Sequence, residues 1–223
     1  MDQKTNITIC CPSRGRPNLA KRMLDTALNT ADKPQSVDIK FYLNDDDIEL
    51  PNYKLMLDKY EVGTHRSTVF SWNQLAEQSD SHLYMLAGDD IQFQTQGWDT
   101  KFMSQFEKHP DGIFCISFQN GIDNKMTAPH PVVTRQWYNA LGYFFPFTFY
   151  HWFVDTYTKD LAESVNRYLF LDDVLVKAKK ITKDHTAQKI RTQGIPQRDQ
   201  YTYDMMKKCY FQTDVQKLKE AIK

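Results

Sequence analysis

The segment Leu83-Tyr84-Met85-Leu86-Ala87-Gly88-Asp89-Asp90 decides the fold class of this chain. Five apolar residues in a row, followed by a glycine and two acids, are typical of a strand that is buried on both faces and ends in a loop. Such strands belong to parallel sheets, whose ligand sites lie beyond the carboxyl ends of the strands. The segment therefore predicts a central strand with two carboxylates held at its end.

Strands and helices alternate on both sides of that segment. Short runs with apolar and β-branched residues predict strands, and apolar residues at helical spacing predict the helices between them. The strands are expected at 7–11, 37–43, 83–87, 113–118 and 168–176. The helices are expected near 17–28, 67–78, 98–106, 135–142, 155–166 and 214–222, and a polar connection at 44–66. This alternation predicts an α/β fold, with a mainly parallel central sheet flanked by helices in a single domain.

The composition excludes several classes of protein. The 223 residues suffice for one sizeable core, and the 28 basic and 28 acidic side chains cancel, so no global positive field favours non-specific nucleic-acid binding. No run approaches the roughly 20 apolar residues that cross a bilayer, and the start lacks the apolar part of a signal peptide. An intracellular protein is expected.

The four cysteines show no C-x-x-C spacing, and three of them lie in apolar runs. A reduced thiol behaves there as a small hydrophobic group, so we expect neither disulfides nor zinc. These residues are Cys10, Cys11, Cys115 and Cys209.

Gly88-Asp89-Asp90 carries the clearest chemical signal. A glycine lets a ligand approach the backbone closely, and the two carboxylates supply the oxygen ligands that Mg²⁺ and Mn²⁺ prefer. A cation bound there can bridge the oxygens of a diphosphate leaving group. The alternative for an isolated Gly-Asp-Asp is an ordinary acidic turn.

Further segments, in a fixed order, accompany this one. They are the first-strand loop Pro12-Ser13-Arg14-Gly15-Arg16-Pro17, the acidic strand end Asn44-Asp45-Asp46-Asp47 and the pair Trp72-Asn73. In this order the chain resembles, over roughly residues 6–176, the GT-A-fold glycosyltransferases of the family 2 group, and its short bacterial and phage members above all. The resemblance implies a GT-A-like (Rossmann-like) catalytic domain over 1–176. Residues 177–223 are then a basic, partly helical extension that packs on the same domain.

The resemblance implies a site for a nucleotide-sugar donor, with UDP as the expected carrier. The loop residues Pro12, Ser13, Arg14 and Arg16 would border the nucleotide together with Asn73 and Gly88, and Asp46, with Asp45 beside it, would accept hydrogen bonds from the base. A carboxylate accepts well from a uracil N–H, and an arginine fork suits phosphate. The alternative is an acidic turn with solvated arginines.

The metal ligands implied by the resemblance are Asp89 and Asp90, because Ala87 stands where the D-x-D motif of the family usually has an acid. Mn²⁺ or Mg²⁺ is the expected ion. Family members often have a further histidine ligand soon after a segment like Leu171-Asp172-Asp173-Val174, where this chain has lysines. His185 is the candidate replacement, and a solvated loop histidine is the alternative.

The acceptor side is implied by later segments. His130 and Arg135 belong to a stretch similar to the acceptor-side segment of these enzymes. The aromatic stretch 143–153 contributes Tyr150, His151 and Trp152, while its plain phenylalanines are expected in the core. Asp155 is the expected general base, with His151 as a second catalytic candidate; a first-turn acid of a helix is the alternative for Asp155.

The expected function is transfer of a sugar from a UDP-linked donor to an acceptor hydroxyl, with inversion as the commoner outcome in the family. The acceptor stays open between a hydroxymethylated pyrimidine in phage DNA, a glycan and a small metabolite, and the expected location is the cytosol of a bacterium or of a phage-infected host. A basic run could grip a phosphate-rich acceptor, close over the diphosphate or form a solvated face. It comprises Lys177, Lys179, Lys180, Lys183, Lys189 and Arg191.

Two rival functions come from other classes. A sugar-phosphate nucleotidyltransferase shares the α/β layout, but its G-x-G-x-R loop is missing from this sequence. A non-catalytic module that binds nucleotide or nucleic acid is the other rival, and it would bind without turnover.

Overall fold

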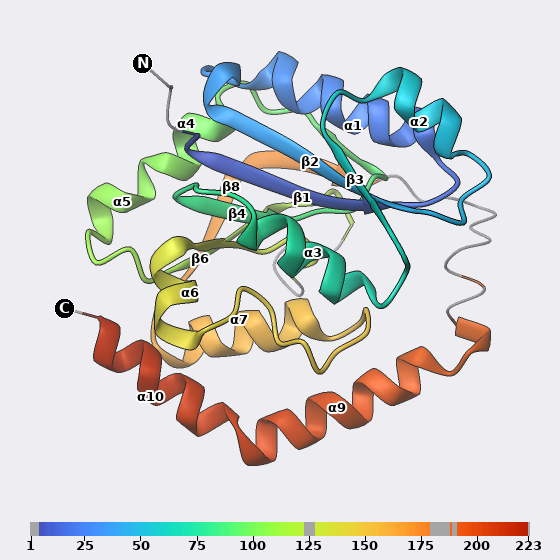
Figure 1. Ribbon diagram of the computed structural model, residues 1–223. Helices are drawn as coiled ribbons and strands as arrows, with labels where there is room; N and C mark the ends of the chain where they lie inside the picture. Colours follow the sequence, from blue (N-terminus) through green and yellow to red (C-terminus); the bar gives the residue numbers. More distant parts are fainter. Residues whose placement is uncertain (1–4, 123–127, 179–187, 189–190, 223) are drawn as a thin grey trace.

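The computed structural model of the chain describes residues 5–122, 128–178, 188 and 191–222. These residues form one eight-stranded sheet in the order β3-β2-β1-β4-β7-β6-β8-β5, with helices on both faces (Figure 1). The strands are β1 Ile7–Ser13, β2 Val37–Asn44, β3 Tyr60–Gly63, β4 Leu83–Leu86, β5 Ile91–Phe93, β6 Cys115–Gln119, β7 Val132–Thr134 and β8 Tyr168–Ala178. β3-β2-β1-β4 are parallel, as are β6 and β8, while β7 and β5 run antiparallel to their neighbours. The predicted single α/β domain with a mainly parallel sheet is confirmed.

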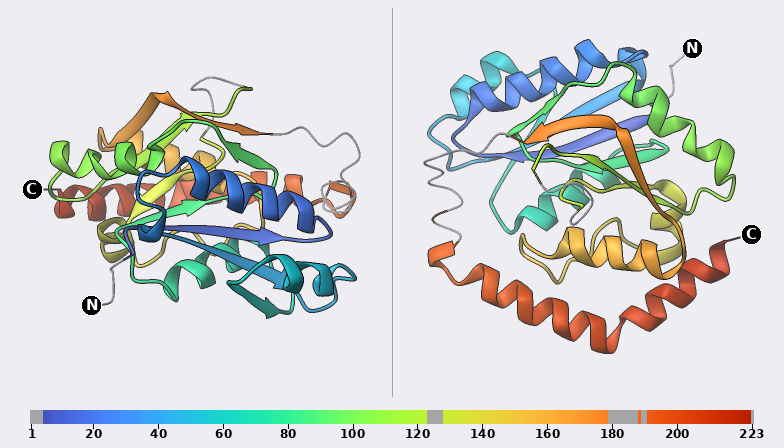
Figure 2. Two further views of the ribbon diagram at one scale, coloured as in Figure 1. Left: turned by 90° about the horizontal axis from the view of Figure 1, so that it is seen from above. Right: turned by 180° about the vertical axis from the view of Figure 1, so that it is seen from behind.

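The helices form layers on the two faces of the sheet (Figure 2). Their bounds are α1 Pro17–Thr30, α2 Leu50–Met56, α3 Thr68–Glu77, α4 Trp98–Met103, α5 Gln105–Lys108, α6 Arg135–Leu141, α7 Val154–Ser164, α9 Ile195–Cys209 and α10 Phe211–Ala221. Apolar side chains of α1, α2 and α4 pack in one core. Those of α3, α6, α7 and α10 pack in a second core on the opposite face. The sheet therefore separates two hydrophobic cores.

β4 is buried on both faces, as its apolar run predicts. Leu83 and Met85 face the core under α1, whereas Tyr84 and Leu86 face the core under α3. Successive side chains of a strand point to opposite faces, so a strand between two helical layers needs apolar residues at every position.

β1 extends further than expected, through Pro12 to Ser13. It pairs with β4 only from Ile7 to Cys10, whereas its pairing with β2 continues to Ser13. Proline has no N–H to donate, so it is tolerated where a neighbouring strand has already ended. The tip of β1 therefore projects beyond β4 on one side.

The region expected as a polar connection, 44–66, contains α2 and β3. β3 is a short edge strand in which the apolar residues Tyr60 and Val62 are exposed. The strand therefore lacks the alternation of buried apolar and exposed polar residues from which a strand is predicted. α2 buries one residue, Tyr53, completely. β5 and β7, with three residues each, are too short for a recognisable period.

α9 is the longest element that the sequence did not predict. Its 15 residues bury only Ile195, Asp199 and Met206, so the apolar stripe that marks an amphipathic helix is sparse. The helix expected near 98–106 is divided at Ser104 into α4 and α5.

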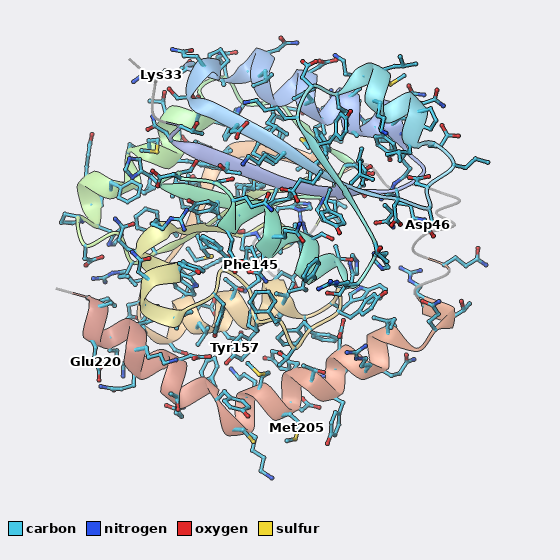
Figure 3. All side chains as sticks on the ribbon, viewed as in Figure 1. Lys33, Asp46, Phe145, Tyr157, Met205 and Glu220 are labelled. Atoms are coloured by element: carbon cyan, nitrogen blue, oxygen red, sulfur yellow. The ribbon has the colours of Figure 1, made fainter. Side chains whose placement is uncertain are left out.

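The C-terminal helices α9 and α10 form an outer layer beside α6 and α7 (Figure 1). Asp214 of α10 accepts hydrogen bonds from the hydroxyls of Tyr143, at 2.6 Å, and Tyr157, at 2.9 Å; Tyr157 is labelled in Figure 3. Met206 and Leu218 join the core under α3. β8 runs to Ala178, past the boundary expected after residue 176, and that boundary stays a prediction.

Cys10, Cys11 and Cys115 are buried, as expected of thiols in apolar runs, and Cys209 is exposed. No helix in the described part of the chain is long and apolar enough to cross a membrane.

Candidate functional site

The carboxyl ends of β1, β2 and β4 lie at one edge of the sheet because these neighbouring strands are parallel. The loops that follow them, 14–16, 45–49 and 87–90, therefore meet at that edge. They contain most of the residues expected to bind the donor.

Asp89 is the centre of this edge, and its carboxylate is fully buried. Its Oδ2 accepts hydrogen bonds from Ser13 Oγ at 2.5 Å and from Arg16 Nε at 3.1 Å, and Arg16 Nη2 lies 2.9 Å from its Oδ1. Burial raises the pKa of Asp89 to about 6, although Arg16 and Ser13 act in the opposite direction. Asp89 thus joins the end of β4 to the loop after β1.

Tyr53 of α2 completes this contact, and the sequence analysis did not identify it. Its hydroxyl lies 2.6 Å from Ser13 Oγ and accepts a hydrogen bond from the Arg16 backbone N–H at 2.8 Å. Because Ser13 donates its one hydroxyl proton to Asp89, Tyr53 must donate to Ser13. Leu50, Tyr53 and Leu57 have helical spacing, and that weak period was the available signal.

Gly88 and Asp90 lie beside Asp89 at the surface of the same edge. A Cβ on Gly88 would lie 2.8 Å from Asp90 Oδ1 and 3.8 Å from His130 Cε1, so the glycine lets the Asp90 carboxylate fold back over the backbone. His130 precedes β7, and the neighbouring Pro131 carbonyl accepts from Leu86 N–H at 3.1 Å. His130 Nδ1 is buried and has no hydrogen-bond partner among the residues that the structure describes, and burial lowers the pKa of this ring.

The three acids after β2 have different surroundings. Asp46, labelled in Figure 3, is exposed and forms a two-pronged ion pair with Arg14, which raises the pKa of the guanidinium. Buried Asp47 accepts from the Gly15 N–H at 2.7 Å and so fixes the loop after β1. Exposed Asp45 accepts from Thr64 Oγ1 at 2.8 Å. Asp45 and Asp46 are therefore the pair that a ligand can reach.

The aromatic segment 150–152 lies against the beginning of α3. The indole of Trp72 stacks on the His151 ring at 6.0 Å between centroids, and its Nε1 donates to the Ala87 carbonyl at 3.0 Å. His151 Nδ1 lies 3.0 Å from Thr68 Oγ1. Trp72 thus links the aromatic segment to the loop that carries Asp89.

The remaining aromatic residues divide between core and surface. The expectation that the plain phenylalanines lie in the core is confirmed for Phe144, Phe145 and Phe149, whereas Phe147 is exposed. The Tyr150 hydroxyl lies 2.7 Å from His65 Nε2, and the Trp152 ring packs edge-on against His151.

Asp155 lies half-buried in the first turn of α7. Its Oδ1 accepts from the Thr156 N–H at 2.8 Å. The preceding Phe153 has φ 64°, a left-handed conformation that turns the chain from the aromatic segment into the helix. Asp155 therefore follows directly on the segment that contacts Trp72.

Two of the expected site residues have other surroundings in the structure, and a third lies outside the part that it describes. Asn73 is buried, and its amide exchanges two hydrogen bonds with the backbone of Phe145, at 2.7 and 3.0 Å. Arg135 lies near the amino end of β4, where it donates to the Tyr84 hydroxyl and covers the Tyr84 ring. His185 lies outside the described residues.

The donor set at the edge fits a hard divalent cation. Among the residues that the structure describes, no three His, Cys, Asp or Glu side chains gather as a metal cage. Mg²⁺ in nucleotide enzymes is usually held by one or two carboxylates together with substrate phosphates, which does not require such a cage. Asp90 and the neighbouring Asp89 supply such carboxylates. Within the described part of the chain, the buried Asp89 Oδ1 has Arg16 Nη2 at 2.9 Å but no well-aligned hydrogen bond.

Comparison with known proteins gives structural relatives alone. No protein-family model and no curated protein sequence matches the chain. Among solved structures, it is similar to the mannosyltransferase PcManGT from Pyrobaculum calidifontis in complex with GDP-Man and Mn²⁺, with TM-score 0.66, 10% identity, 98% of this chain covered and 74% of that one. It is also similar to S. aureus TarS 1-349 in complex with UDP-GlcNAc, with TM-score 0.60, 13% identity, 82% of this chain covered and 61% of that one. The chain therefore has the GT-A fold.

Proposed function

We propose that the protein is a metal-dependent glycosyltransferase that moves a sugar from a nucleoside diphosphate, UDP being our choice, to an acceptor hydroxyl. The observation that carries this proposal is the junction of the ends of β1 and β4 through Ser13, Arg16 and Asp89, to which Asp47 after β2 is joined by accepting from the Gly15 N–H. It sets Asp90 beside Gly88 at the edge where α/β sheets bind nucleotides. The two structural relatives are glycosyltransferases in complex with nucleotide sugars, which supports the same reading of the fold.

The donor would lie across the loops after β1, β2 and β4. Asp46, with Asp45 beside it, accepts hydrogen bonds from the base, for which the Arg14–Asp46 pair must open or rotate. Both side chains of this ion pair reach solvent, and exposed ion pairs contribute about 0–1 kcal/mol to stability. Opening the Arg14–Asp46 pair therefore costs little. Arg14 is then available for a diphosphate oxygen.

Asp90 and, behind it, Asp89 would hold Mn²⁺ or Mg²⁺, whose chemistry there is to neutralise charge on the departing diphosphate. The Arg16–Asp89 pair keeps the buried carboxylate in place. Gly88 leaves the backbone open to the diphosphate.

The acceptor would approach from the side of the aromatic segment. Asp155 takes the proton of the attacking hydroxyl, and Tyr150, His151 and Trp152 offer rings with polar tips that stack on a sugar or a base. A single displacement on this plan inverts the configuration at the sugar carbon. His130, next to Asp90, faces the same edge.

The aromatic segment 150–152 suits two classes of acceptor. A glycan hydroxyl and a hydroxymethylated pyrimidine of phage DNA both suit an aromatic platform. Of the basic run, Lys177 and Arg191 lie in the described part of the chain, and Lys179, Lys180, Lys183 and Lys189 lie outside it.

The test is a thermal-shift and turnover panel with UDP, GDP, UDP-GlcNAc, GDP-mannose and UTP, each with and without Mn²⁺. We expect the diphosphates to raise Tm in a metal-dependent manner, UDP most, and the nucleotide sugars to be turned over slowly with water as acceptor. Asp90→Asn should lose the metal-dependent part of the shift. Asp80→Asn, an exposed acid at the amino end of β4, is the matched control and should keep it.

Other results of this panel would contradict the proposal. A preference for UTP would favour a nucleotidyltransferase, and binding without turnover would favour a binding module. No response to any nucleotide would remove the nucleotide site altogether.

A further inference from the structure

Three consecutive backbone N–H groups of the aromatic segment converge on one carboxylate, that of Asp199 in α9. Tyr150 N donates to Oδ1 at 2.9 Å, and His151 N and Trp152 N donate to Oδ2 at 2.8 Å each. Asp199 is fully buried. A buried carboxylate with three well-placed N–H donors fixes the backbone that supplies them, because each donor would otherwise lose its partner.

The conformation of the segment depends on its contacts with neighbouring elements. It belongs to no helix or strand. From the other side, the Tyr150 carbonyl accepts from the N–H groups of Thr68 and Val69 at the beginning of α3. Phe153 follows with φ 64°. A residue other than glycine keeps this left-handed backbone conformation only when its surroundings enforce it. Asp199 and α3 together enforce the turn into α7.

Arg198, the neighbour of Asp199, contacts the same segment through a side chain. Its guanidinium carbon lies 5.6 Å from the centre of the Tyr150 ring. The first turns of α9 thus hold Tyr150 by both backbone and ring, although α9 lies more than forty residues later in the chain.

The segment held in this way extends into the candidate site. The His151 ring stacks on Trp72, whose indole N–H donates to the carbonyl next to Gly88. On the other side, the chain passes through Phe153 to Asp155. A shift of the segment would therefore move both the aromatic platform and the expected base.

We propose that Asp199 is a positioning residue for sugar transfer, which fixes the segment 150–152 and, through Phe153, the place of Asp155. This inference rests on the proposed function, because it takes that segment as the acceptor side. On this proposal α9 contributes to the geometry of the acceptor side through Asp199. Displacements of about 1 Å in a catalytic group can lower a rate by about a hundred-fold, so loss of this anchor should lower kcat rather than donor binding.

The test compares Asp199→Asn with Asp160→Asn. The amide has the shape of the carboxylate but accepts at one oxygen, so at least one of the three N–H groups loses its acceptor. Asp160 of α7 also binds α9, through the Tyr203 hydroxyl at 2.5 Å and Lys207 Nζ at 2.9 Å, without touching the segment 150–152. It therefore controls for loosening of α9 in general.

Two readouts are measured on the full chain. Amide hydrogen exchange of a peptide covering 150–152 should be about ten-fold faster in Asp199→Asn and unchanged in Asp160→Asn. Hydrolysis of UDP-GlcNAc and GDP-mannose with Mn²⁺ should show kcat lowered at least about ten-fold in Asp199→Asn, with the donor KM within about two-fold of the wild-type value.

Wild-type exchange in Asp199→Asn would overturn the inference, and so would faster exchange with an unchanged kcat or an equal loss of kcat in Asp160→Asn. If Asp199→Asn does not fold, the exposed Arg198→Ala decides: kcat should fall at unchanged Tm, and a wild-type kcat would overturn the inference. Failure of the wild-type protein to turn over either donor would refute the proposed function, and with it the role of Asp199 in transfer. The exchange result would still show whether Asp199 holds the segment.

Discussion

Replacing Asp89 by asparagine should stabilise the metal-free protein at neutral pH while abolishing transfer. The pKa of the Asp89 carboxyl is about 6 in the fold, against an ordinary value of 3.8, because burial removes its charge from water. Between these pH values the unfolded chain has released a proton that the folded chain retains, so this group lowers the stability of the fold as pH rises through that window. Asparagine resembles the neutral acid and avoids the loss.

The magnitude follows from the size of the shift. Roughly two pKa units at about 1.4 kcal/mol each give about 3 kcal/mol, which corresponds to a rise in Tm of roughly 6–12 °C for a chain of this size. The gain should be present above about pH 6 and should disappear near pH 4. Urea denaturation of both proteins with a chelator, between about pH 4 and pH 8, measures it.

Asp99→Asn is the matched control, because the substitution is the same and the expected sign is opposite. The buried Asp99 carboxylate accepts from the backbone N–H groups of Asp32 and Lys33, at 2.8 and 2.9 Å. One of these donors loses its acceptor in the variant, which costs about 1–3 kcal/mol. If Asp89→Asn is instead less stable than the wild type at every pH, the pair with Arg16 outweighs the cost of burial and the reasoning is wrong.

Three further predictions concern single positions. Gly88→Ala should weaken metal-dependent nucleotide binding at least about ten-fold, measured by calorimetry, because the new methyl group displaces the Asp90 carboxylate. Tm should change little, and wild-type affinity would show that this carboxylate is not needed for binding. Asn73→Ala should cost about 2 kcal/mol in urea denaturation, because it leaves the Phe145 backbone unpaired, and nucleotide affinity should not change; a loss of affinity would return Asn73 to the donor site. In the native protein a maleimide should react with one thiol, that of exposed Cys209, as measured by intact mass. The other thiols, those of Cys10, Cys11 and Cys115, are buried, and burial raises their pKa and so keeps them unreactive. A second adduct would contradict their burial.

The sequence predicts the fold well where its period is strong. The continuous apolar run of β4 identifies a strand between two helical layers, and Gly88-Asp89-Asp90 marks its end. From parallel strand ends alone one can expect the loops after β1, β2 and β4 to meet. The contacts within the meeting point are less accessible to sequence reasoning, because Asp45, Asp46 and Asp47 look alike in the sequence and differ only in burial and partner.

Tyr53 and Asp199 show why the remainder escapes. Each belongs to an element with a sparse apolar pattern, and each acts on residues far away in the chain: Tyr53 on Ser13, and Asp199 on the segment 150–152. Such pairings depend on how elements pack, which no local pattern of residue types encodes. Arg135 shows the opposite error. Its charge suggests contact with a ligand, but its guanidinium packs on the Tyr84 ring, at the end of β4 away from the candidate site.

The adjacency of β1 and β4 has a consequence for how such a site can diversify. α1, which follows β1, crosses one face of the sheet, and α3, which leads into β4, crosses the other. The helix after β1 and the helix before β4 thus lie on opposite faces of the sheet, so neither passes over the tips of these two touching strands. The exposed positions of the loops there, Asp45 and Asp46 among them, can therefore change without disturbing either core, whereas the buried Asp47 and Asp89 cannot.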